Sequence, residues 1–212
     1  MKKPPLSKLE ALDSCGAGFR VEFFWRSDRY AHTIYGVLRG EAIPLLESDE
    51  GDSTAVWPVS PPLQQLHREE RPGIGVGAVL LLTGVAGKSH WSASVTGFGD
   101  ARYTNLGFRF ACRFREQPEW LGATYRVAKG IFADQPSEDG GILLKTGEQG
   151  IEFALCPSTI EISIATEWIL TSSVRMAGDT VKICTQNTPH MTTPTTKEWA
   201  YELRFTRPHW IE

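Results

Sequence analysis

The sequence FRFACRFR, residues 108–115, decides the fold class, because apolar and polar side chains alternate along its whole length. Such alternation is typical of a β-strand with one buried and one exposed face. The segment HWSASV, residues 90–95, alternates in the same way, with Trp91, Ala93 and Val95 in one phase. If Val95 pairs with Phe108, the apolar residues of both segments share one face of an antiparallel pair. The two segments therefore predict a hairpin, with residues 96–107 as its loop.

This register also fixes the opposite, polar face of the hairpin. It places Trp91 opposite Cys112, Ala93 opposite Phe110, His90 opposite Arg113 and Ser94 opposite Arg109. Planar arginine side chains bind carboxylates, phosphates and hydroxyl-rich ligands through paired hydrogen bonds. The polar face therefore predicts a site for a small polar ligand, anionic or sugar-like. Its candidate ligand-binding residues are Lys88, His90, Ser92, Ser94, Arg109, Arg113 and Arg115.

A second interpretation of the same face is a solvated surface with ion pairs. Three arginines on one strand repel one another unless acids or a ligand offset their charge. Acids on the polar phases of other predicted strands could supply this charge, and the candidates are Glu22, Glu161 and Glu202.

Alternation recurs along most of the chain, with turn-forming residues about every 8–15 residues and almost no amphipathic helix between them. Further predicted strands include residues 21–26 and 33–38 (a hairpin), 78–83, 142–145, 151–155, 160–164, 174–176, 181–184 and 199–205. The pattern predicts an all-β protein: a single-domain antiparallel β-sandwich over residues 1–212, with two packed sheets and ten or more strands. A closed β-barrel is the alternative.

Two short helices and three irregular segments complete the prediction. Residues 61–70 begin with two prolines and end before Arg71-Pro72-Gly73, which favours a short helix. Residues 6–12 give a weaker signal of the same kind. Residues 1–18 are expected to form an N-terminal arm. Residues 41–62 and 185–197 are expected to form long loops, and the acid-rich stretch 41–52 is expected to be solvated.

Composition excludes several classes of protein. The chain has 22 Lys and Arg against 25 Asp and Glu, a net charge of −3, which does not favour nucleic-acid binding. The first residues lack the apolar run of a signal peptide, and the longest uncharged stretch, residues 72–87, is shorter than the about 20 residues of a membrane-spanning helix. The expectations are a cytoplasmic protein with neither a nucleic-acid nor a membrane partner. The oligomeric state stays open.

Known cofactor and metal motifs are not matched. Residues 82–89, LTGVAGKS, resemble a phosphate-binding loop but lack its first glycine and the helix that follows. They predict a turn between two strands. The five histidines lie far apart, so neither a metal nor a cofactor is predicted. No Cys-x-x-Cys pair occurs, and Cys112 falls on an apolar phase, which predicts a buried thiol.

The seven tryptophans divide into two groups. Trp25, Trp91 and Trp199 fall on apolar phases and are predicted to lie in the core. Three others lie beside prolines or turns and are the candidates for contact with a ligand: Trp57, Trp120 and Trp210.

The sequence leaves three functions open. The first is the binding of a small polar ligand on the cationic face. The second is a carbohydrate-active enzyme of the epimerase or lyase type, which needs two or more carboxylates or histidines beside the arginines. The third is a protein–protein interaction domain, which needs an exposed apolar patch.

Overall fold

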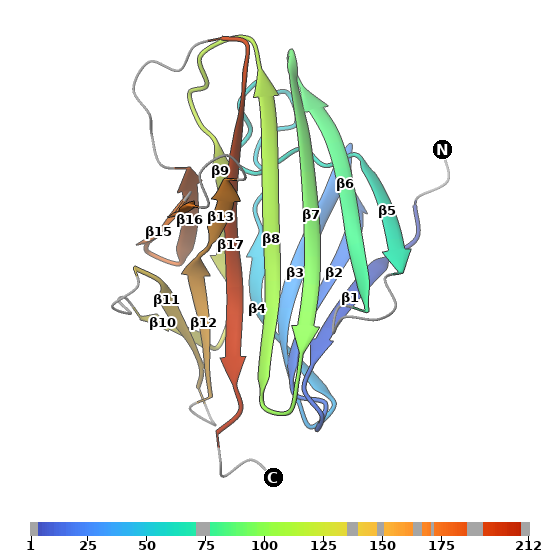
Figure 1. Ribbon diagram of the computed structural model, residues 1–212, viewed down its shortest axis with the longest axis vertical. Coiled ribbons are helices and arrows are strands. Elements are labelled where there is room, and N and C mark those ends of the chain that lie inside the picture. The colour runs from blue at the N-terminus through green and yellow to red at the C-terminus, as the bar shows by residue number, and fades with distance from the viewer. Residues whose placement is uncertain are drawn as a thin grey trace.

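The computed structural model describes residues 4–70, 77–134, 140–147, 151–162, 167–170, 172–185 and 193–208. Within these residues the chain forms 17 strands and no helix. The strands build two antiparallel sheets packed face to face (Figure 1), which confirms the predicted sandwich in place of a barrel.

One sheet has seven strands. In spatial order they are β1 (Ser7–Leu12), β2 (Gly18–Arg26), β3 (Arg29–Leu38), β4 (Glu41–Ser48), β9 (Gly122–Val127), β16 (Thr180–Thr185) and β15 (Ser172–Ala177). The predicted hairpin of residues 21–38 is the pair β2–β3 of this sheet, and the predicted strands 174–176 and 181–184 are the pair β15–β16.

The other sheet has eight strands. In spatial order they are β10 (Ile131–Asp134), β11 (Ile142–Thr146), β12 (Glu152–Pro157), β17 (Thr195–Thr206), β8 (Tyr103–Phe114), β7 (Ser89–Gly99), β6 (Ala78–Ala86) and β5 (Gln65–Glu70). Figure 1 shows β17, β8 and β7 side by side in front of β2, β3 and β4. A separate pair, β13 (Thr159–Ile162) and β14 (Glu167–Leu170), contacts the eight-stranded sheet at β17.

The central hairpin β7–β8 has the predicted register. His90 pairs with Arg113 and Val95 with Phe108. The predicted loop 96–107 is wrong, however, because both strands continue through it and Gly99 still pairs with Thr104. The turn between the strands is therefore short. Within it, the Asp100 side chain accepts hydrogen bonds from the backbone N–H groups of Arg102 and Tyr103. Glycines within residues 96–107 indicated a loop, but here they lie in paired strand.

The core lies between the two sheets and is rich in aromatic side chains. Phe108, Phe110 and Phe114 of β8 are at most 2% exposed, and Phe110 stacks on Trp199 of β17. Side chains of the two sheets also meet directly: the ring of His32 on β3 stacks against Phe108 on β8. One apolar cluster therefore joins both sheets.

Both predicted helices are wrong. Residues 6–12 contain β1, which pairs with β2, and residues 61–70 contain β5, which pairs with β6 along its whole length. Helical propensity is a weak preference, and pairing with the edge of an existing sheet outweighs it in these short segments. The predicted N-terminal arm, residues 1–18, likewise contains β1.

The predicted long loops are shorter than expected. Residues 41–62 contain β4, and Glu50, within the supposedly solvated stretch, is only 8% exposed. The predicted loop 185–197 overlaps the end of β16 and the start of β17, while residues 186–192 lie outside the described part of the chain.

The segment that leads into β5 crosses from one sheet to the other. The carbonyl oxygen of Leu63 accepts a hydrogen bond from Tyr30 on β3, and the backbone N–H of Gln64 donates to Thr83 on β6. It passes so close to β6 that a Cβ atom on Gly84 would lie 1.7 Å from the Pro62 carbonyl oxygen. The prolines therefore belong to an irregular crossing, in which the Leu63 N–H donates to the Pro61 carbonyl oxygen. Such a segment suits the fixed φ of proline as well as a helix start does.

No helix in the described part of the chain is long and apolar enough to cross a membrane.

Candidate ligand-binding face

The outer surface of β7 and β8 carries the predicted polar face. Because the phenylalanines of β8 fill the core, the alternate residues Arg109 and Arg113 point away from it, and both are exposed. Neither forms an ion pair with any residue in the described part of the chain. We call this surface the arginine face and define it by five predicted residues: His90, Ser92, Ser94, Arg109 and Arg113.

A first depression, with a volume of about 430 Å³, lies at one end of the arginine face. Its lining includes Arg113 from β8 and His90 and Ser92 from β7. The cross-strand pairing of His90 with Arg113 brings the imidazole and guanidinium side chains to the same end of this depression. The arrangement offers a fixed positive charge together with hydrogen-bonding groups.

A second depression, of about 520 Å³, lies further along the same two strands. Arg109 and Ser94, which pair across β7 and β8, both line it. Glu202 of β17 lines it as well, but its carboxylate is already bound to the Arg204 side chain and to the amide of Asn105. Arg109 is therefore the cation of this depression that has no ion-pair partner among the described residues.

Two of the seven predicted residues line neither depression. Lys88 lies in the turn between β6 and β7, which confirms the turn predicted within residues 82–89. Its side chain forms an exposed ion pair with Glu116 at 2.7 Å. Arg115 follows the end of β8 and is exposed. The structure thus brings five of the predicted residues together along β7 and β8.

Two of the three acids expected to neutralise the arginines interact with other arginines. Glu22 lies in the other sheet and is 3.8 Å from Arg20, and Glu202 is bound to Arg204. Glu161 lies on β13, and its side chain is outside the described structure. Glu198, an exposed acid that was not predicted on this face, pairs with Ala111 between the two arginines. Its position depends on β17 lying beside β8, which no local pattern predicts.

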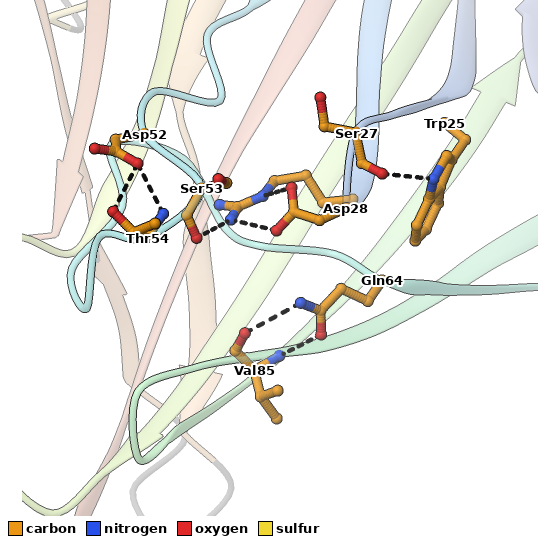
Figure 2. Close-up of polar contacts among 9 residues, drawn as sticks. Trp25, Ser27, Asp28, Asp52, Ser53, Thr54, Gln64 and Val85 are labelled. Atoms are coloured by element: carbon orange, nitrogen blue, oxygen red, sulfur yellow. Dashed lines mark hydrogen bonds and ion pairs between the residues drawn. The ribbon is translucent and has the colours of Figure 1, made fainter.

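Strands β5, β6 and β17 also contribute side chains to the first depression, and none of these residues was predicted as part of the site. Gln64 is held in place because its side-chain amide both accepts from the backbone N–H of Val85 and donates to its carbonyl oxygen (Figure 2). Thr83 on β6 and Thr196 on β17 add hydroxyl groups to the lining. These groups match the hydrogen-bonding needs of a ligand rich in hydroxyls.

The tryptophan predictions have mixed outcomes. Trp91 and Trp199 are buried as predicted, and Trp25 packs against the core from a half-buried position. Two of the three candidates for ligand contact interact with the protein itself. Trp57 packs edge-on against the core ring of Phe114, and the Trp120 indole donates to the carbonyl oxygen of Val59. The third candidate, Trp210, lies outside the described residues.

A buried polar cluster, missed by the sequence analysis, lies between the sheets. His32 hydrogen-bonds to the Tyr125 hydroxyl at 2.8 Å, and Tyr125 bonds in turn to the hydroxyl of Tyr201. Burial lowers the pKa of His32 to about 3, so its imidazole is neutral at physiological pH. Ser48 accepts from the His32 backbone N–H and donates to Glu50. Burial is also the main cause that raises the pKa of Glu50 to about 7.

Cys112, the predicted buried thiol, is a free cysteine in the core, and burial raises its pKa to about 12. Among the described residues, no group of three or more His, Cys, Asp or Glu side chains is placed to hold a metal ion.

The fold and the arginine face together define an antiparallel β-sandwich with an exposed cationic patch on one sheet. A scan against protein-family models, a search of curated proteins and a search of solved structures each found no match to this chain.

Proposed function

We infer that the protein binds a small hydroxylated anion, such as an acidic sugar, in the first depression. The observation that carries this proposal is Arg113, an exposed guanidinium that lines a depression and has no ion-pair partner among the described residues. A carboxylate or phosphate of the ligand would accept its paired hydrogen bonds. Ser92, Thr83 and the neighbouring side chains would hydrogen-bond to hydroxyl groups of the ligand.

The geometry favours binding over the two other functions. An epimerase or lyase needs convergent acid–base groups, yet among the described residues that line the first depression His90 is the only histidine or carboxylate. An interaction domain would use exposed tryptophans, whereas Trp57 and Trp120 are engaged with the protein itself.

The test is ligand binding by wild type and by Arg113→Ala, measured by thermal shift and calorimetry with galacturonate, glucose 6-phosphate, malate and glucose. We expect one or more of the three anions to stabilise wild type, glucose to have little effect, and Arg113→Ala to lose about tenfold or more in affinity. Without ligand, the variant should melt within about 2 °C of wild type, because Arg113 is exposed and makes no ion pair.

The matched control is Arg175→Ala, which removes an exposed arginine from β15 in the opposite sheet. It should bind like wild type. A wild-type protein that responds to none of the anions would contradict the proposal. An Arg113→Ala variant that melts many degrees lower would instead assign the arginine a structural role.

A further inference from the structure

The two depressions are consecutive along the same pair of strands. Ser92 lines the first and Ser94 the second, and these are successive outward-facing residues of β7. On β8, Ala111 of the first depression and Arg109 of the second are related in the same way. Successive residues on one face of a strand are about 7 Å apart, so the two depressions adjoin.

The two arginines mark the two halves of this surface. Arg109 and Arg113 are four residues apart on β8, which corresponds to about 13 Å along the strand. That separation exceeds the width of a single carboxylate or phosphate. A ligand that engages both guanidinium groups must therefore be elongated and must carry anionic groups at more than one point along its length.

Small side chains lie along the surface between and beside the arginines. They are Ser92, Ser94, Gly107, Ala111 and Ala200. Side chains of this size leave room for a ligand to lie flat across β7 and β8. Glu198 of β17, which pairs with Ala111, is exposed beside this surface and repels an anionic group placed there, so the carboxylates of a ligand must lie at the two arginines. We call this surface, from the first depression to the second, the trough.

We propose that the trough binds a linear oligosaccharide that carries repeated carboxylates, with one carboxylate at Arg113 and another at Arg109. This inference rests on the proposed function and extends it from a small anion to a chain. Hydroxyl groups line both halves, from Thr83 and Thr196 in the first depression and from Thr96 in the second. A polyhydroxylated chain uses such groups along its whole length, whereas inorganic anions do not.

The lining of the trough favours an acidic sugar chain over two other linear anions. Single-stranded nucleic acid is bound by exposed aromatic platforms on a basic surface. Here the aromatic residues that line the trough, Trp91, Phe108 and Tyr201, are at most 2% exposed and offer no such platform. An acidic peptide carries fewer hydroxyl groups to match the serine and threonine side chains of the trough.

The experiment measures the affinity of wild type, Arg109→Ala and Arg113→Ala for oligogalacturonates from monomer to hexamer. For wild type, affinity should rise at least tenfold between the monomer and chains that span about 13 Å, and then level off, because a second contact on the same chain is effectively intramolecular. Arg113→Ala should weaken binding of every length. Arg109→Ala should leave the monomer nearly unchanged and remove the gain with length.

Neutral malto-oligosaccharides of the same lengths, polyglutamate and oligothymidylate serve as ligand controls, and Arg175→Ala is the protein control. The inference that the trough binds a chain is wrong if wild-type affinity does not increase with length and Arg109→Ala binds every length like wild type. The proposed monomer site at Arg113 would then still stand. Absence of monomer binding, or monomer binding that is insensitive to Arg113→Ala, overturns the proposed function itself. Tighter binding of a neutral chain, the peptide or the oligonucleotide also overturns the inference.

Discussion

Burial strongly changes the ionisation of single side chains in this protein, and Glu50 is the clearest case. The acid-rich stretch 41–52 predicted a solvated loop, but Glu50 is folded inward beside Ser48. Its pKa rises to about 7 chiefly because burial disfavours the charged carboxylate. Nearby Asp49 raises it further, while the Ser48 hydrogen bond, Arg29 and Arg26 lower it. No pattern in the sequence distinguishes this glutamate from its exposed neighbours.

Glu50 makes the stability of the protein depend on pH. Because the folded state holds the Glu50 proton more tightly than the unfolded state, this stabilising contribution is complete below pH 4.5 and is lost as the pH rises through about 7. A pKa raised from 4.5 to about 7 corresponds to about 3 kcal/mol. Glu50→Gln removes the titration, so its stability relative to wild type should increase by about 2–3 kcal/mol between pH 5 and pH 8.

Urea unfolding of both proteins across this pH range measures the difference. The contribution of His32 has the opposite sign, because its lowered pKa makes stability fall on acidification below 6.5, but it is common to both proteins and cancels. Glu47→Gln, at an exposed carboxylate, is the control and should show no comparable trend. A difference between Glu50→Gln and wild type that stays constant with pH would refute the assignment.

At the scale of elements, the central hairpin was predictable and the crossing before β5 was not. Alternation fixes the β7–β8 register, because a slip of one residue would expose every phenylalanine of β8. Residues 61–64, in contrast, are held by backbone hydrogen bonds to β3 and β6, elements distant from one another in the sequence. Their conformation follows from where those strands lie.

The close approach of this crossing to β6 gives a test. Gly84→Ala places a Cβ atom 1.7 Å from the Pro62 carbonyl oxygen, so the backbone must move. We expect a loss of about 2 kcal/mol or more in unfolding free energy, measured by urea denaturation. Gly77→Ala, where no atom of the described residues lies within 4 Å of the new Cβ, should change stability by about 0.5 kcal/mol or less. Equal effects of the two substitutions would show that the crossing does not constrain Gly84.

At the scale of the whole molecule, the two sheets share one core. The hydroxyl groups of Tyr125 on β9 and Tyr201 on β17 are hydrogen-bonded across the sandwich, and His32 stacks on Phe108 in the opposite sheet. Separating the sheets would expose these aromatic side chains and leave their buried polar groups without partners.

That residues 1–212 form a single domain stays a prediction. Because the two sheets share one core, we expect the chain to unfold in one cooperative transition. Denaturation followed by far-UV circular dichroism, which reports on the strands, should coincide with denaturation followed by the fluorescence of buried Trp91 and Trp199. Two separated transitions would show that the sheets unfold as independent units.

The sequence by itself determined the all-β class, the register of β7 against β8, and the exposure of Arg109 and Arg113 on a face opposite the core. These features follow from side-chain alternation, which is local and has a period of two. The tertiary structure alone decided that β17 lies beside β8, that Glu198 falls between the arginines, and that residues 65–70 form a strand in place of a helix. These depend on which distant strands share an edge, a choice made by the total burial of apolar surface and not by any one segment.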